Sequence, residues 1–258
     1  MEIYFIIGFL SLITGFLSGL LGIGGGIILG PLLLYVPPLF DLAPLAMRDV
    51  AGLTIVQGLL ACLGGVFVHR KFHFVSNKLS LCMGITIFIT AGLGGAAAGL
   101  ISNEILLFIF SCLAFVAAIL MIKPVKNDDE KPDAAFVHFK WQRAVTAASG
   151  VGLFGGMVGQ GGSFILIPLM ISYVKIPTRI AIGSNLAIVF LSSMAAFLSK
   201  AVTGQIQWLM TIPIVLVVIP FACLGGYVSS KVSILWLRRI LACLIAGCAL
   251  WMWFSLLC

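Results

Sequence analysis

The sequence predicts an all-α polytopic membrane protein built from two homologous repeats. Three observations predict this class. Of the 258 residues, 62% are hydrophobic and only 9% are charged, the apolar residues gather in long runs, and one glycine-rich pattern occurs twice. A soluble core cannot hide so large an apolar fraction, whereas a helix needs roughly 20 apolar residues to cross the ~30 Å hydrocarbon core of a membrane. We therefore expect a chain that crosses the lipid bilayer many times.

Seven apolar runs are candidates for membrane-spanning helices. They are residues 3–21, 50–68, 79–100, 105–122, 181–198, 210–228 and 240–257. The chain opens with an acid and no basic residue, unlike a cleaved signal peptide, so we expect the first run to be retained. The seven cysteines lie in or at the end of these runs and form no CxxC pair. We expect them to be buried packing residues, with no disulfide framework and no metal site.

Each half of the chain also contains an apolar stretch that glycines interrupt. The first reads GLLGIGGGIILGPLL from residue 19, and the second reads GMVGQGGSFILIPLM from residue 156. With an offset of 137 (152 − 15), nine of the eighteen positions in residues 15–32 are identical in residues 152–169. Many secondary transporters are built from such internal repeats. The duplication divides the chain into a first repeat (1–122), a polar cytoplasmic linker (123–142) and a second repeat (143–258).

The basic residues indicate how the two repeats are oriented. In one arrangement each glycine-rich stretch is the tip of a helical hairpin, and three transmembrane helices follow it. Thirteen Lys and Arg residues are then cytoplasmic, and only Arg48 and Lys200 lie outside. If each stretch is instead one continuous crossing, the better orientation places nine inside and six outside. Because cytoplasmic loops carry an excess of Lys and Arg, the first arrangement is favoured, with inverted repeats and both termini outside.

The two interruptions are the candidate site, and we call residues 22–26 (GIGGG) the first glycine segment and residues 159–163 (GQGGS) the second glycine segment. A broken helix is tolerated at membrane depth only where it is buried in protein or lines a wet cavity. Two segments that enter from opposite sides can meet near the midplane. The half-helices that follow would then aim two partly positive N-termini at a small oxyanion. The alternative is that these glycines only allow close helix packing, as we expect for the GxxxG pair Gly15 and Gly19.

Polar residues near these segments complete the candidate site. Ser184 and Asn185 begin a second-half span, and Thr54 and Gln57 lie one turn apart on the equivalent first-half span. For Asn185 the alternative is a hydrogen bond to a neighbouring helix. The candidate substrate-binding residues are Gly22, Gly24, Gly25, Gly26, Thr54, Gln57, Gly159, Gln160, Gly161, Gly162, Ser163, Ser184 and Asn185.

Other functions find less support in the sequence. The net charge of +7 lies in short loops without a basic, aromatic-rich stripe, so we expect no nucleic-acid partner. We expect His69, His73 and His138 to lie in loops, which leaves a coupling proton without an assigned carrier and disfavours an intramembrane enzyme. We expect no cofactor. Stripes of small residues leave a homodimer open.

The two glycine segments, with the spans that begin MRDVAGLT and RIAIGSNLA, resemble those of the TauE/SafE family of membrane transporters. The resemblance runs over nearly the whole chain. It implies a secondary transporter in a bacterial-type inner membrane that exports sulfite or an organosulfonate such as sulfoacetate by alternating access. A passive small-anion channel on the same scaffold is the alternative. Ser163 stands where the family usually has a third glycine, and Ser184 and Asn185 stand where it often has Thr-Ser. These departures leave the individual anion open.

Overall fold

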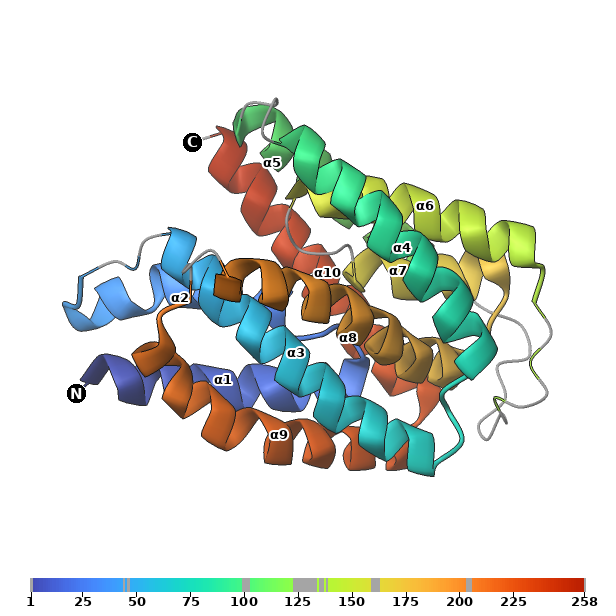
Figure 1. Cartoon of the computed structure of the whole chain (residues 1–258), viewed down its shortest axis with the longest axis horizontal. Helices are drawn as coiled ribbons and strands as arrows, with labels where there is room; N and C mark the ends of the chain where they lie inside the picture. Colours follow the sequence, from blue (N-terminus) through green and yellow to red (C-terminus); the bar gives the residue numbers. More distant parts are fainter. Residues whose placement is uncertain are drawn as a thin grey trace.

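The computed structural model describes residues 2–43, 45, 47–98, 103–122, 134, 137, 139–158, 163–202 and 206–257. Within these residues every regular element is a helix and no β-strand occurs, so the predicted all-α class is confirmed. Figure 1 shows long helices that lie side by side, with the N-terminus and the C-terminus toward the same side of the molecule.

The two halves of the chain have the same order of helices. The first half contains α1 (Glu2–Leu21), α2 (Gly26–Tyr35), the 3-10 helix η1 (Pro37–Phe40), α3 (Met47–Lys71), α4 (Asn77–Ala98) and α5 (Asn103–Ile122). The second half contains α6 (Trp141–Val158), α7 (Ser163–Leu169), the π-helix η3 (Met170–Val174), α8 (Thr178–Val202), α9 (Trp208–Lys231) and α10 (Ile234–Leu257). The seven predicted spans fall on α1, α3, α4, α5, α8, α9 and α10.

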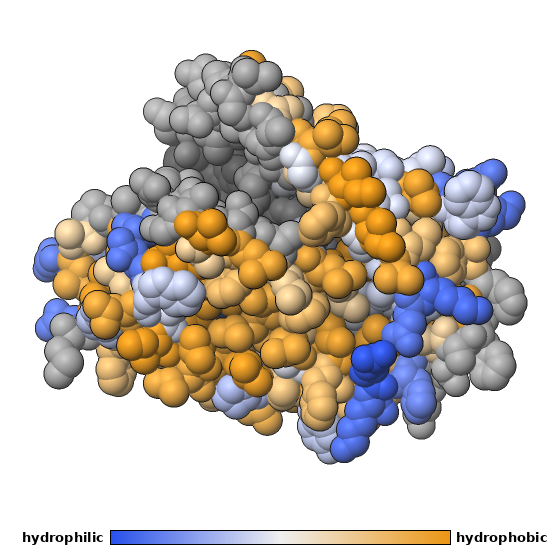
Figure 2. Space-filling view, viewed as in Figure 1, coloured by the Kyte–Doolittle hydropathy of each residue, from blue (hydrophilic) through white to orange (hydrophobic). Residues whose placement is uncertain are grey.

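Several helices have the length and the surface of membrane spans. Within the described residues, four stretches are long and apolar enough to cross a membrane, namely Glu2–Leu21, Gly52–Lys71, Asn77–Gly94 and Trp208–Lys231. Large apolar side chains on these helices face outward, and Phe5 and Phe67 are 85% and 74% exposed. Figure 2 shows apolar groups over the middle of one face and hydrophilic groups toward its ends. Such a surface suits lipid contact, which supports an integral membrane protein.

Glycines allow the long helices to touch at their backbones. α1 packs along α9, and a methyl group added at Gly19 would come within 2.0 Å of the Ala222 carbonyl oxygen. Gly15 meets Val218 on the same face, so α1 and α9 run parallel. The close packing expected for the first GxxxG pair is therefore confirmed. α6 packs along α4 in a similar way, where a methyl group at Gly152 would overlap the Thr90 hydroxyl.

α3 and α8 cross the centre of the molecule in opposite directions. Leu186 of α8 lies against Gly65 of α3, and Ser193, further along α8, lies near Gly58, which is earlier in α3. Close to the start of α8, Gly183 meets His69 in the last turns of α3. Positions along this antiparallel pair therefore show how far from either end of the bundle a neighbouring segment lies.

Basic residues gather at one end of the molecule, which we call the basic end. Arg179 at the start of α8 donates hydrogen bonds to the carbonyl oxygens of Ser229 at 2.6 Å and Val232 at 2.9 Å, which joins α8 to the end of α9. Its guanidinium also lies 5.5 Å from the centre of the Phe74 ring, in the connection between α3 and α4. The helix ends and connections at this end carry Arg70, Lys71, Lys78, Lys140, Arg143, Lys175, Arg179, Lys231, Arg238 and Arg239.

The expectation that all three histidines lie in loops is wrong for His69. α3 continues to Lys71 and places His69 in its last turns, where the side chain is 1% exposed. The His69 Nε2 lies 3.0 Å from the Gly19 carbonyl oxygen, which accepts the hydrogen bond. The run of His, Arg and Lys looked like a loop because it is polar, yet the histidine ring faces inward and the two cations after it face solvent. His73 is exposed in the turn after α3, and His138 lies outside the described residues.

Candidate functional site

The first glycine segment breaks the chain between α1 and α2. Gly22, Gly24 and Gly25 have φ angles of 75°, 75° and 70°. Residues with a Cβ avoid this left-handed region, because the Cβ approaches the carbonyl oxygen too closely. The Gly22 N–H closes the last turn of α1 on the Ser18 carbonyl oxygen at 2.8 Å, and α2 begins at Gly26. The predicted interruption is therefore present in the first half.

The first glycine segment lies near the middle of α3 and α8. A methyl group at Gly22 would come within 2.6 Å of the Ile182 carbonyl oxygen, close to the start of α8. A methyl group at Gly24 would come within 2.9 Å of Val189, halfway along α8. The Gly24 carbonyl oxygen lies 3.2 Å from the Cβ position of Gly58, near the middle of α3. The first glycine segment thus extends from Gly22, on the side of the basic end, to Gly24, near the centre of the bundle.

Two residues of the second half bind the carbonyl oxygens of this segment. The Ser163 hydroxyl, at the start of α7, donates to the Ile23 carbonyl oxygen at 2.8 Å. The Asn185 Nδ2 donates to the carbonyl oxygens of Gly22 at 2.6 Å and Ser163 at 3.1 Å. Both side chains are buried, and within the described residues the Asn185 Oδ1 has no hydrogen-bond partner. Asn185 therefore joins the start of the first glycine segment to the start of α7, the helix that follows the second glycine segment.

A second polar cluster lies on the other side of the same segment. The Gln57 Nε2 donates to the Thr14 hydroxyl, and a methyl group at Gly25 would lie 3.1 Å from that Nε2 and 3.3 Å from the Ser18 Cβ. Ser11, Thr14, Ser18 and Gln57 are fully buried. Within the described residues, the Oγ atoms of Ser11 and Ser18 and the Oε1 of Gln57 have no hydrogen-bond partner. Unpaired polar atoms point inward beside the break.

The sequence interpretation missed three of these residues. Ser11, Thr14 and Ser18, which we call the hydroxyl face, are spaced by three and four positions and so lie on one side of α1. That spacing inside an apolar run was the signal that could have found them. The same face of α6 is apolar or small, so the hydroxyls belong to the first half only. At the offset of 137, the equivalent residues are Ala148, Val151 and Gly155.

Two other predicted residues lie differently from Asn185. The Ser184 hydroxyl accepts a hydrogen bond from the Ser76 N–H at 3.0 Å, and the Ser80 hydroxyl donates to the Ser184 carbonyl oxygen at 3.4 Å. Ser184 thus faces the connection into α4 and not the glycine segment. The backbone of Thr54 lies beside Gly26, where a methyl group would be 3.4 Å from the Thr54 carbonyl oxygen.

The rest of the second glycine segment lies outside the described residues. α6 ends at Val158 and α7 begins at Ser163. The predicted site residues in between, of which the structure says nothing, are Gly159, Gln160, Gly161 and Gly162.

The described part of the site offers neutral hydrogen-bonding groups. Ser18 of α1 and the amides of Gln57 and Asn185 lie against the first glycine segment, and α2 begins at the last residue of this segment. Helix N-termini and neutral donors can hold an anion without a lysine or arginine. Within the described residues, no group of three or more His, Cys, Asp or Glu side chains could hold a metal ion. The arrangement suits reversible binding of a small polar solute.

Known proteins give an independent comparison. The family described as "Sulfite exporter TauE/SafE" matches residues 6–252. The probable membrane transporter protein YunE of Bacillus subtilis is 26% identical, over 93% of this chain and 94% of its own length. A probable membrane transporter protein of Methanocaldococcus jannaschii is 24% identical, over 96% of this chain and 93% of its own. No solved structure matches the chain significantly. Because the family match covers nearly the whole sequence, the chain belongs to the sulfite exporter TauE/SafE family of membrane transporters.

Proposed function

We propose that the protein is a secondary transporter that exports a small sulfur-containing anion, such as sulfite or an organosulfonate, across a bacterial-type inner membrane. The description of the matching family supports this substrate class. The anion binds between the two glycine segments. The observation that carries this site is the pair of hydrogen bonds from Asn185 to the carbonyl oxygens of Gly22 and Ser163, which ties the two halves together at the first break.

Unpaired polar atoms of α1, on the face that contacts Gly25, favour a polar ligand. A buried polar group without a partner costs about 1–3 kcal/mol, and the hydroxyl oxygens of Ser11 and Ser18 are two such groups. Both hydroxyls can donate to an anion or to the water around it. A ligand that accepts these hydrogen bonds would recover this cost, whereas a purely structural cluster would leave it unmet.

Inverted repeats account for the pairing of the helices. α3 and α8, which are third in the α-helix order of their halves, run antiparallel. α1 packs on α9 and α6 packs on α4, so the first helix of each half contacts the fourth helix of the other. A two-fold axis in the membrane plane produces this exchange, and rocking of one half against the other around a fixed site would give alternating access.

The basic end is cytoplasmic in this proposal, and both termini lie outside. The described Lys and Arg residues lie mostly at the basic end, as the positive-inside rule requires of cytoplasmic loops. α1 runs toward the basic end and α10 starts there (Figure 1). The start of α1 and the end of α10 therefore lie on the opposite side of the membrane.

Flux into proteoliposomes tests the proposal. Uptake of labelled sulfite, sulfoacetate and sulfate is measured with and without an imposed pH gradient. We expect saturable flux of one sulfur anion that responds to the gradient. Flux that neither saturates nor responds would indicate a passive anion channel on the same scaffold. The absence of flux for all three anions would overturn the proposed substrate class.

A further inference from the structure

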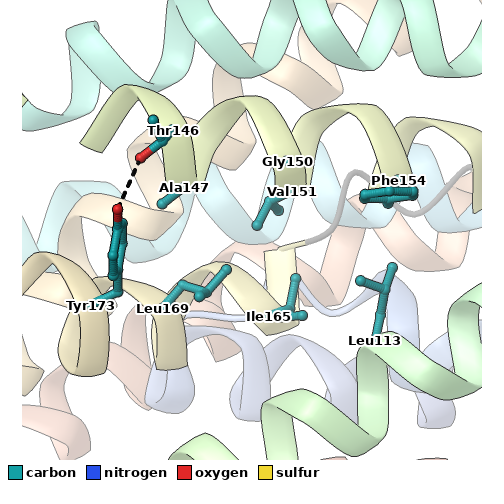
Figure 3. Close-up of a pocket in the computed structure, with 9 residues that line it drawn as sticks. All are labelled: Leu113, Thr146, Ala147, Gly150, Val151, Phe154, Ile165, Leu169 and Tyr173. Atoms are coloured by element: carbon teal, nitrogen blue, oxygen red, sulfur yellow. Dashed lines mark hydrogen bonds between the residues drawn. The ribbon is translucent and has the colours of Figure 1, made fainter. Parts of the chain in front are cut away.

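An apolar groove of about 400 Å³ opens between α5, α6 and α7, away from the glycine segment (Figure 3). Leu113, Val151 and Ile165 are among the side chains that line it, and Phe154 at one end is 43% exposed. None of the candidate substrate-binding residues that the structure describes lines the groove. Because it opens on an outer face of a membrane-spanning bundle, its natural contents are hydrocarbon chains and not water.

Among the described residues that line the groove, the two with polar side chains lie together at its other end. In Figure 3, Thr146 and Tyr173 face each other across this end, and their hydroxyl oxygens are 3.5 Å apart. The Arg143 Nη1 donates to the Tyr173 carbonyl oxygen at 3.5 Å, and its guanidinium carbon lies 5.7 Å from the centre of the Tyr173 ring. The groove therefore opens at the basic end.

Basic residues gather at the polar end of the groove. Lys140 lies one turn before Arg143, Lys175 lies two residues after Tyr173, and both lysines are exposed. The eight acidic residues all occur at or before Asp133, so neither α6 nor any later element contains one. Trp141 beside Lys140 is 66% exposed, as is typical of residues at the level of the lipid headgroups.

A glycine keeps the groove open. A methyl group at Gly150 would meet no heavy atom within 4 Å. At the offset of 137, the first half has Ile13 in this position, so the groove is not a shared consequence of the duplication. The nine residues from Thr146 to Phe154 span roughly 12 Å, as eight steps of about 1.5 Å each. That length is most of one leaflet, which is half of the ~30 Å hydrocarbon core.

From these features we infer that the groove binds an anionic phospholipid of the leaflet at the basic end. One acyl chain lies between α6 and α7 along Gly150, and the phosphate binds at Arg143, Lys140 and Lys175. A guanidinium matches the geometry of a phosphate, and basic pockets between transmembrane helices favour anionic headgroups. The bound chain packs between the two legs of the second hairpin, so the lipid stabilises this hairpin.

Lipid binding to the purified full-length protein tests this inference. The protein in detergent is titrated with phosphatidylglycerol or with phosphatidylcholine of the same acyl chains, and bound lipid is counted by native mass spectrometry. We expect at least a tenfold preference for phosphatidylglycerol, together with a rise in the unfolding temperature. Equal binding of the two lipids would overturn the inference. Displacement of phosphatidylglycerol by millimolar inorganic phosphate would also overturn it, since the site would then bind free phosphate.

Two variants and two matched controls locate the binding. Gly150→Leu fills the groove and Arg143→Gln removes the headgroup contact, so both should lose the preference for phosphatidylglycerol. The control Gly92→Leu adds the same side chain at an exposed helical glycine, where a Cβ would likewise meet no heavy atom within 4 Å. The control Arg239→Gln removes a cation over the Trp236 ring at the same end of the molecule. The inference would be contradicted if both test variants kept the wild-type preference for phosphatidylglycerol. It would also be contradicted if both controls lost that preference as fully as the test variants. Neither result depends on transport.

Discussion

Replacement of Gly25 by alanine should damage the protein, whereas the same change at the neighbouring Gly26 should not. Gly25 has a φ of 70°, and its Cβ position lies 3.1 Å from the Gln57 Nε2 and 3.3 Å from the Thr14 carbonyl oxygen. Gly26 is the first residue of α2, and the atom nearest to its Cβ position is the Thr54 carbonyl oxygen, at an ordinary contact distance of 3.4 Å. The two sites differ in backbone conformation and in available space.

The structure sets the size of the expected effect. An L residue in the left-handed region costs about 1–2 kcal/mol, and an overpacked methyl group in a well-packed interior costs about 1–3 kcal/mol. Gly25→Ala should therefore destabilise the protein by about 2–5 kcal/mol. This corresponds to a drop in Tm of roughly 4–20 °C for a chain of this length. Gly26→Ala should be neutral or slightly stabilising, because alanine favours a helix more than glycine does.

Thermal unfolding of the two variants in the same detergent measures this difference, with anion flux in proteoliposomes as the second readout. A Tm for Gly25→Ala within about 1 °C of the wild type would refute the reasoning from backbone conformation. An equal drop in Tm for Gly25→Ala and Gly26→Ala would refute the argument that a methyl group is crowded at Gly25 and accommodated at Gly26.

Three further substitutions separate packing from binding. Gly19→Ala should cost more than about 3 kcal/mol, because its methyl group meets the backbone of Ala222 and no side chain can move aside; an unchanged Tm would contradict the packing of α1 on α9. Asn185→Ala leaves the carbonyl oxygens of Gly22 and Ser163 without their donor, so the Tm and the flux should both fall, at about 1–3 kcal/mol for each unpaired group. Ser18→Ala removes a buried hydroxyl with no protein partner among the described residues, so the protein should become more stable, by up to about 1–3 kcal/mol, while anion flux falls; intact flux would remove the hydroxyl face from the site.

The sequence was sufficient for the spans and for the first break because both depend on local composition. Twenty apolar residues predict a helix of membrane length, and adjacent glycines predict an interruption wherever they fall in such a run. Helix ends were harder to place. α3 extends past Val68 because His69 packs against Gly19, a residue fifty positions earlier in the chain. No local pattern reports that contact.

The direction in which a side chain points was also beyond the sequence. Neighbouring residues of a helix point roughly 100° apart, at 3.6 residues per turn. Ser184 and Asn185 therefore face different neighbours, and only the packing of α8 decides which one meets the glycine segment. The hydroxyl face could have been predicted, because Ser11, Thr14 and Ser18 are spaced by three and four positions and so share one side of a helix. The apolar groove is formed by α5, α6 and α7, which come from both halves of the chain, so no local sequence pattern predicts it.

The central claim is that the first glycine segment and its polar neighbours hold the transported anion. Equilibrium binding of radiolabelled sulfite to the purified protein tests this claim most directly, with the wild type, Ser18→Ala and Gly26→Ala compared in one detergent. We predict saturable binding to the wild type and to Gly26→Ala, and at least tenfold weaker affinity in Ser18→Ala, which corresponds to about 1.4 kcal/mol. Saturable sulfite binding with the same affinity in all three proteins would contradict the claim.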